Sequence, residues 1–236
     1  MPGMAAENVS ALTFDIFGTV VDWRGTIVRE GADLDASIDW AAFAEAWRGL
    51  YQPMLDRVRN GERPWTKLDD LERMAFDQVL VERGLTGLDE TQKQHLNDVW
   101  GRLEAWPDAV PGLTRLKAKY TVCTLSNGSV RQMVGIAKRA HLPWDMILCA
   151  ELFQAYKPDP RTYLGAAQLL QLEPGQIMMV AAHVSDLRSA RSHGLRTAFV
   201  ARPLEWGPDH AIEQPRPGEF DVMASDLVDL AARLGA

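Results

Sequence analysis

The alternation of short apolar runs with helical patterns constrains the fold of this chain most strongly. Segments with the length and composition of buried strands are ALTFDIF (11–17), YTVCTLSN (120–127), DMILCA (145–150), IMMVAAH (177–183) and RTAFVAR (196–202), with FDVMAS (220–225) as a weaker sixth. From Tyr120 onward they alternate with helical patterns such as SVRQMVGIAKRAH (129–141) and RTYLGAAQLLQL (161–172). Strands that alternate with helices predict an α/β fold with a parallel sheet.

The segment from residue 23 to residue 106 follows a different pattern. Helical spacing recurs in SIDWAAFAEAWRGLYQPMLDRV (37–58), KLDDLERMAFDQVLVERG (67–84) and LDETQKQHLNDVWGRLEAW (88–106), and nothing in this block resembles a strand. We therefore predict a core domain formed by residues 1–22 and 107–236, with residues 23–106 inserted as a helical domain.

Composition narrows the class of partner. The chain has 236 residues, a formal net charge of -7 and no apolar run long enough for a membrane-spanning helix. An acidic chain is a poor match for nucleic acid or an anionic membrane, so we expect neither as a partner. Cys123 and Cys149 lie in apolar runs and are expected to be buried and unpaired. The N-terminus lacks the pattern of a signal peptide, and a cytoplasmic location is the expectation.

Polar residues gather where the predicted strands end. They are Asp15, Thr19, Ser126, Asn127, His183 and Asp186, and Lys157 lies in a loop between two predicted elements. Because the carboxyl ends of parallel strands meet at one edge of a sheet, we expect these side chains to converge there. A lysine between two carboxylates would keep Asp15 ionised, and an ionised carboxylate in a dry site is a nucleophile.

Four short segments in a fixed order identify a family. DIFGT (15–19), LSNGS (125–129), YKPDPRTY (156–163) and VAAHVSD (180–186) resemble the four motifs of the haloacid dehalogenase superfamily, and the resemblance covers nearly the whole chain. It implies a three-layer, Rossmann-like α/β core with a parallel sheet, and an α-helical cap inserted after the first motif.

The branch of the superfamily depends on a few positions. The superfamily's phosphatases carry a second Asp two residues after the nucleophile, where this chain has Phe17, and a Gly-Asp pair where it has Ala181 and Ala182. DIFGTVVDW (15–23) and SNGS (126–129) are instead similar to the (S)-2-haloacid dehalogenase branch, which works without a metal or other cofactor. The resemblance implies hydrolysis of short 2-haloalkanoic acids, such as haloacetates and 2-halopropionates, to 2-hydroxy acids. A Mg²⁺-dependent small-molecule phosphatase and a hydrolase of another small 2-substituted carboxylate are the alternatives.

The resemblance also implies roles for single residues. Asp15 matches the nucleophile that forms an ester with the substrate, Thr19 and Lys157 match the residues that hold it, and Asp186 matches the residue that activates water. His183 stands where better-known members carry Asn, and it can position that water or act with Asp186 as a base.

Further residues are implied to contact the substrate. Arg48 matches the arginine that contacts the substrate's carboxylate or the leaving halide. Ser126 matches a contact to the carboxylate, and Asn127 matches a contact to the halide. Tyr163 matches the tyrosine that follows the motif lysine by six positions. Phe17 and Trp23 are expected to keep the pocket dry. A homodimer is compatible with the resemblance, because this branch often forms one.

Overall fold

A five-stranded parallel sheet forms the centre of the computed structural model, which describes residues 8–236. Its strands, in the spatial order β4-β1-β5-β6-β7, are β4 (Thr121–Thr124), β1 (Ala11–Phe14), β5 (Ile177–Ala181), β6 (Arg196–Val200) and β7 (Val222–Ala224). The chain moves from β1 to β4 on one side and later to β5 on the other. The predicted α/β fold with a parallel sheet is confirmed.

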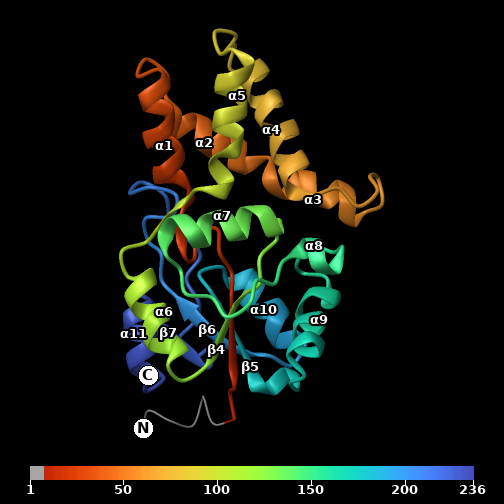
Figure 1. The fold of residues 1–236 in the computed structure, drawn as a ribbon, viewed down its shortest axis with the longest axis vertical. Helices are drawn as coiled ribbons and strands as arrows, with labels where there is room; N and C mark the ends of the chain where they lie inside the picture. Colours follow the sequence, from red (N-terminus) through yellow and green to blue (C-terminus); the bar gives the residue numbers. More distant parts are fainter. Residues whose placement is uncertain (1–7) are drawn as a thin grey trace.

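Helices cover both faces of this sheet (Figure 1). One face packs against α6 (Ala109–Lys117) and α11 (Leu227–Arg233), and the other against α9 (Pro160–Leu170) and α10 (Val184–Ser192). Successive residues of a strand point to opposite faces, so Leu12 joins the first core and Ala11 the second. Three further elements complete the core: the helix α7 (Val130–Ala140), the short helix α8 (Ala150–Phe153) and the 3₁₀ turn η3 (Pro174–Gln176). The predicted three-layer core is confirmed.

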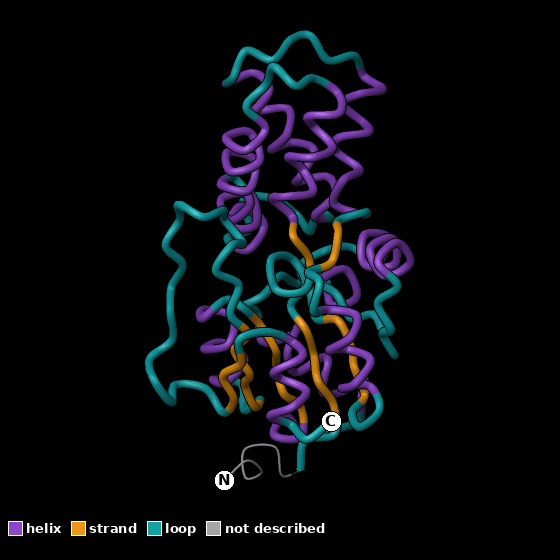
Figure 2. Tube along the Cα trace, turned by 90° about the vertical axis from the view of Figure 1, so that its left-hand side faces the viewer, coloured by secondary structure: helices purple, strands orange, loops and turns teal. Residues whose placement is uncertain are grey.

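The remaining helices lie together beyond the carboxyl end of β1 (Figures 1 and 2). They are α1 (Trp23–Leu34), α2 (Trp40–Gly49), α3 (Tyr51–Arg59), α4 (Leu68–Glu82), α5 (Glu90–Asn97) and the 3₁₀ turn η2 (Asp98–Gly101). We call this group the cap. Aromatic rings fill its interior: Trp47 lies 4.9 Å from Phe76 and 5.2 Å from Trp100, measured between ring centroids. The domain boundaries at residues 22/23 and 106/107 stay a prediction.

Two local expectations were wrong. Segment 145–150 forms no strand in the structure: Met146 and Cys149 make isolated bridges only. Thr124 explains part of this, because its hydroxyl bonds both the carbonyl oxygen (2.7 Å) and the amide (3.0 Å) of Leu148. The block expected to lack strands contributes β3 (Glu104–Ala105), which pairs antiparallel with β2 (Val21–Asp22) where the chain enters and leaves the cap.

Two simpler expectations can be checked directly. Cys123 and Cys149 are both buried and both free. Within residues 8–236, no helix has the length and apolar character needed to cross a bilayer.

Candidate active site

The candidate site lies at the carboxyl ends of the strands, beside β1, where the order of the strands reverses: β4 is added on one side of β1 and β5 on the other. Asp15 follows β1, Asn127 follows the neighbouring β4, and His183 follows β5 on the other side. In open parallel sheets this switch point leaves a crevice at the carboxyl ends of the strands. The sheet topology therefore brings together side chains that are more than 160 residues apart in sequence, as in Asp15 and His183.

Asp15 is a buried carboxylate with a partner on each oxygen. Lys157 Nζ donates to Oδ1 at 2.9 Å, Thr19 Oγ1 donates to Oδ2 at 2.8 Å, and His183 Nδ1 lies 3.0 Å from Oδ2. Burial alone would raise the pKa of Asp15, but the adjacent Lys157 and His183 hold that pKa far below its usual range. Asp15 is thus an ionised nucleophile candidate.

Lys157 lies between two carboxylates. Besides Asp15, its Nζ donates to Asp186 Oδ2 at 2.5 Å, and the hydroxyl of Tyr163 donates to Asp186 Oδ1 at 2.6 Å. Burial would lower the pKa of Lys157, but the charges of Asp15 and Asp186 raise it above its ordinary value. The backbone N–H of Lys157 also donates to Asn127 Oδ1 at 2.7 Å, which fixes the loop that carries the lysine.

Glu205 is a site residue that the sequence analysis missed. It lies in the long loop between β6 and β7, which runs up beside the cap (Figure 2). Its carboxylate is buried, accepts a hydrogen bond from Trp23 Nε1 at 3.1 Å, and has both oxygens 3.1 Å from His183 Nε2. Glu205 follows the predicted strand 196–202, so extending the search for polar residues past that strand's end would have included it.

His183 therefore lies between two buried carboxylates. Burial would lower the pKa of its imidazole, but the charges of Glu205 and Asp15 raise this pKa to about 10. These two carboxylates therefore favour the charged imidazolium form of His183 near neutral pH. His183 is the residue before α10, and it remains partly exposed to the cavity described below.

Gly18 makes room for this arrangement. Its φ of +86° lies in the region that favours glycine, and a Cβ there would stand 2.1 Å from Glu205 Oε1. The glycine of the first motif thus allows the buried Glu205 carboxylate to approach the turn after β1.

The cap contributes a cation to the opposite wall. The guanidinium carbon of Arg48 lies 3.9 Å from the centre of the Tyr51 ring and 5.9 Å from that of Phe17. Tyr51, which the sequence analysis also missed, accepts a hydrogen bond from Asn127 Nδ2 at 2.9 Å and so joins the cap to the core. A hydrophobic spacing pattern alone does not distinguish such a tyrosine from a packing residue.

A cavity of about 420 Å³ opens between the core and the cap. Eight of its lining residues were predicted site residues: Asp15, Phe17, Arg48, Asn127, Lys157, Tyr163, His183 and Asp186. The other three predicted site residues, Thr19, Ser126 and Trp23, do not line the cavity and lie behind its wall. Thr19 accepts from the Ala182 amide at 2.9 Å while it donates to Asp15, and Ser126 Oγ accepts from the Gly128 amide at 3.1 Å. Trp23 is buried against Glu205.

The cavity has a defined chemical character. It combines the carboxylates of Asp15 and Asp186 with the cations Lys157 and His183 beside them. Arg48 and Arg59 add two further cations from the cap, together with the aromatic rings of Phe17 and Tyr51. In the part of the chain that the structure describes, no group of three or more His, Cys, Asp or Glu side chains is arranged to hold a metal ion. The arrangement fits a small anionic substrate attacked by a carboxylate.

Comparison with known proteins identifies the family. The family model of haloacid dehalogenase-like hydrolases matches residues 9–194, and the chain belongs to that family. The (S)-2-haloacid dehalogenase 4A of Burkholderia cepacia is 31% identical over 207 residues, which cover 83% of this chain and 84% of the relative.

Two solved structures are more similar in sequence. The L-2-haloacid dehalogenase PA0810 is 45% identical, with a TM-score of 0.92 and coverage of 96% of this chain and 99% of that one. The defluorinating L-2-haloacid dehalogenase Rha0230 is 43% identical, with a TM-score of 0.94 and coverage of 100% and 99%. The predicted resemblance to this branch is confirmed, and so is the prediction of a hydrolase of the dehalogenase type.

Proposed function

We propose that this protein hydrolyses short 2-haloalkanoic acids, such as haloacetates and 2-halopropionates, to 2-hydroxy acids through an ester on Asp15. The observation that carries the proposal is the buried, ionised Asp15 carboxylate facing a cavity whose opposite wall presents Arg48. The names of the relatives, which are 2-haloacid dehalogenases, support the same substrate class.

The first step is a displacement at carbon. An Asp15 oxygen forms a bond to C2 of the substrate while the carbon–halogen bond breaks, and the halide leaves with the electron pair. Lys157 and Thr19 orient the attacking carboxylate through the bonds described above. Arg48 and the amide of Asn127 stand on the cavity wall, where they stabilise the substrate's carboxylate and the departing halide.

The second step is hydrolysis of the ester. Esterification removes the negative charge of Asp15, which is one of the two charges that raise the pKa of His183. Loss of that charge lets His183 release its proton to the solvent, and the neutral imidazole then takes a proton from a water molecule as the water oxygen adds to the Asp15 carbonyl carbon. The same proton passes to the 2-oxygen of the product as the ester bond breaks, and the proton left on the Asp15 carboxyl group returns to His183.

Glu205 and Asp186 act as positioning residues in this scheme. Glu205 holds the far nitrogen of the His183 ring, so the near nitrogen stays directed at Asp15. Asp186 was expected from the sequence to activate water, but its two oxygens already accept bonds from Lys157 and Tyr163. We therefore assign Asp186 to holding Lys157 against Asp15.

Isotope labelling tests the ester. With enzyme in excess over 2-chloropropionate in ¹⁸O-water, a single turnover should place the label in the Asp15 carboxylate, as measured by mass spectrometry of the peptide. Label that appears directly in the 2-hydroxyl group of the product would exclude the ester route.

A substrate panel tests the reaction class. We expect halide release from chloroacetate, bromoacetate and one enantiomer of 2-chloropropionate, at rates that EDTA does not change. Fluoroacetate is tested as a further substrate in the same panel. Absence of halide release, together with EDTA-sensitive hydrolysis of p-nitrophenyl phosphate, would favour the phosphatase alternative.

A further inference from the structure

Helix α3 contacts the core at both of its ends, beside the loop that carries Lys157. The hydroxyl of Tyr51, the first residue of α3, accepts a hydrogen bond from Asn127 Nδ2 at 2.9 Å. The guanidinium of Arg59, the last residue of α3, donates from Nη2 to the carbonyl oxygen of Lys157. Asn127 in turn accepts from the N–H of Lys157 at 2.7 Å. One cap helix therefore meets the Lys157 loop directly at one end and through Asn127 at the other.

The backbone of Lys157 depends on side chains for its position. Lys157 is buried, and it lies in the irregular segment between α8 and α9, outside any helix or strand. Its N–H donates to the Asn127 side chain and its carbonyl oxygen accepts from the Arg59 side chain. The next residue, Pro158, has no N–H to add to the loop's hydrogen bonds. One core residue and one cap residue thus hold the peptide groups on either side of the lysine.

Arg59 is itself held in one orientation. Its Nη1 donates to Asp56 Oδ1 at 2.7 Å and to Gln52 Oε1 at 3.1 Å, and both partners belong to α3. Because the guanidinium group is planar and its donors are fixed relative to one another, these two bonds also set the direction of Nη2. The arginine is therefore already oriented toward the Lys157 carbonyl group.

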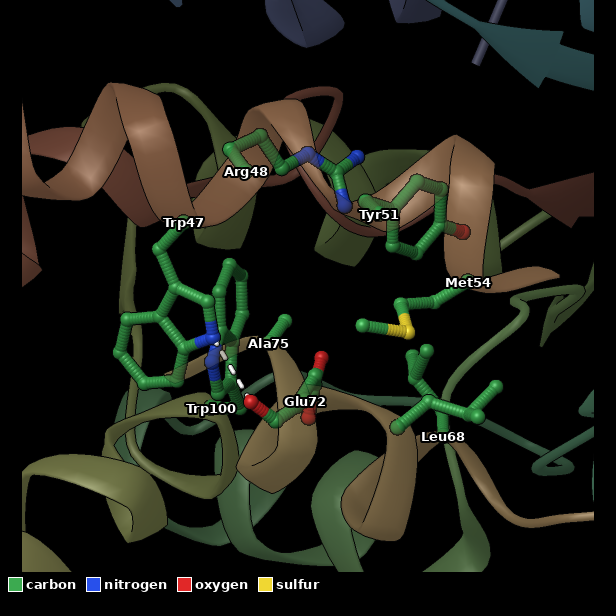
Figure 3. A pocket seen from close by; sticks show the side chains of 9 residues that line it. Trp47, Arg48, Tyr51, Met54, Leu68, Glu72, Ala75 and Trp100 are labelled. Carbon is green, nitrogen blue, oxygen red and sulfur yellow. Dashed lines mark hydrogen bonds between the residues drawn. The ribbon is translucent and has the colours of Figure 1, made fainter. Parts of the chain in front are cut away.

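The inner face of α3 is packed into the cap. Met54 and Leu55 are buried, and Figure 3 shows the Met54 side chain extending into the interior of the cap, near Leu68 of α4. A helix anchored in this way cannot follow a displaced loop without disturbing the cap. Arg59 therefore ties the backbone of Lys157 to the position of the cap.

Other contacts join the cap to the same loop. The hydroxyl of Tyr156 donates to the Thr66 carbonyl oxygen at 2.6 Å, and the Tyr156 ring lies 4.8 Å from the Trp65 ring, measured between centroids. Lys67 and Glu151 form an ion pair nearby. Since these contacts do not involve Arg59, its replacement should loosen the peptide group of Lys157 without detaching the loop from the cap.

The placement of Lys157 controls the nucleophile candidate. Its Nζ lies 2.9 Å from Asp15 Oδ1 and 2.5 Å from Asp186 Oδ2, so a shift of the lysine backbone would disturb both bonds. Attack on carbon requires the reacting oxygen to be correctly aimed, and a misplacement of about 1 Å can cost about 100-fold in rate. A residue that fixes the Lys157 backbone can therefore affect the reaction without touching the substrate.

We propose that Arg59 is a positioning residue that holds Lys157 against Asp15 by binding the lysine's carbonyl oxygen. The effect on the reaction rate rests on the proposed function of Asp15 as the nucleophile, whereas the effect on the loop does not. Arg59 also lines the large cavity, so a direct contact with the substrate is the competing role that the experiments must separate.

Hydrogen exchange tests the hold on the loop without turnover. In the full-length protein without substrate, the backbone N–H of Lys157 should exchange with deuterium at least about tenfold faster in Arg59→Met than in wild type, as followed by NMR. This factor corresponds to the loss of roughly one hydrogen bond to a charged group. Arg57→Met, at an exposed position of the same helix, is the matched control and should exchange like wild type. An equal exchange rate in Arg59→Met and wild type would overturn the proposal.

Single-turnover kinetics test the effect on the reaction. Ester formation on Asp15 is followed by rapid quenching and mass spectrometry over a range of 2-chloropropionate concentrations. Arg59→Lys keeps the positive charge and one donor but cannot bind Asp56, Gln52 and Lys157 in one plane. We expect the limiting rate to fall by about 10- to 100-fold in Arg59→Met and by less in Arg59→Lys. The substrate concentration at half the limiting rate should stay within about twofold in Arg59→Lys.

The opposite kinetic pattern would assign Arg59 to the substrate. A raised half-saturating concentration with an unchanged limiting rate in Arg59→Lys would mean that Arg59 binds the substrate, and the proposal would fail. Unchanged ester formation in Arg59→Met would also overturn it. Thermal melting of each variant, compared with Arg57→Met, shows whether a lower rate reflects a general loss of stability.

The two measurements separate this inference from the proposed function. A protein that forms no ester with any haloacid, but whose Lys157 N–H exchanges faster in Arg59→Met, keeps the hold on the loop and loses the proposed reaction. A protein that forms the ester equally well in wild type and Arg59→Met, with equal exchange rates, keeps the reaction and loses the positioning role.

Discussion

The imidazole of His183 touches the nucleophile candidate directly: its Nδ1 lies 3.0 Å from Asp15 Oδ2, while Nε2 lies 3.1 Å from both oxygens of Glu205. A ring that bonds a carboxylate through each nitrogen is fixed in orientation and favours its charged form. The charge of His183 thus depends on whether Asp15 is free or esterified, which couples the two chemical steps of the proposed reaction.

Replacing Glu205 with Gln should disturb the second step more than the first. We expect Glu205→Gln to lower the pKa of His183 from about 10 by at least about one unit and kcat by about 10- to 100-fold, as for a misplaced base. The His183 titration is followed by NMR, and ester accumulation by mass spectrometry of the quenched enzyme. Glu213→Gln, at an exposed site in the same loop, is the control. An unchanged His183 titration would show that Glu205 does not set its charge.

The layered fold was predictable because its cause is local. The apolar runs at 11–17, 120–127, 177–183 and 196–202 each contain a strand, and their alternation with helices determines a parallel sheet. Segment 145–150 has the same composition, yet the Thr124 side chain occupies the backbone groups of Leu148. Composition cannot reveal such a competition, so that prediction failed.

The candidate site was only partly predictable, for a related reason. Motif residues such as Asp15 and Lys157 are recognisable because they lie at fixed places relative to strands. Glu205 and Tyr51 depend on how a long loop and the cap fold back onto the core, which is a tertiary relationship without a short sequence pattern.

Arg48 should not be replaceable by Lys. The flat guanidinium stacks 3.9 Å from the Tyr51 ring centre, and a lysine ammonium reproduces neither this stacking nor the planar set of donors. We expect Arg48→Lys to lower kcat/KM for 2-chloropropionate by about tenfold or more, equivalent to about 1.4 kcal/mol, with little change in Tm. Arg83→Lys, at the exposed end of α4, controls for the loss of an arginine. A kcat/KM equal to that of wild type would remove Arg48 from the substrate site.

Gly18 should tolerate no side chain. An added Cβ would meet Glu205 Oε1 at 2.1 Å, and the φ of +86° is itself unfavourable for alanine. We expect Gly18→Ala to lower the free energy of unfolding by about 1 to 3 kcal/mol and also to reduce activity, because Glu205 must shift. Gly87→Ala is the matched control, since its Cβ would meet no atom within 4 Å. Urea unfolding of both variants measures the difference, and equal stability would mean that Glu205 moves aside at no cost.

The stability contribution of His183 should disappear as the solution becomes alkaline. Its pKa in the folded protein is about 10, against about 6.5 in an unfolded chain. A raised folded-state pKa contributes stability that is fully present below about pH 6.5 and is lost as the pH rises through about 10. We therefore expect the difference in unfolding free energy between wild type and His183→Gln to be largest near pH 6. The difference should shrink by about 1 to 3 kcal/mol by pH 10, a range that allows for the partial exposure of the ring.

The pH window isolates this histidine from its neighbours. The pKa values of Asp15 and Glu205 are lowered in the folded protein, so their contributions are lost only as the pH falls toward acid. Urea unfolding at several pH values between 6 and 10 measures the difference, and His141→Asn, at an exposed helix end, should show no comparable change. If the difference between wild type and His183→Gln stays constant from pH 6 to 10, His183 is not a cation held between two carboxylates, and the proposed coupling of its charge to the state of Asp15 fails with it.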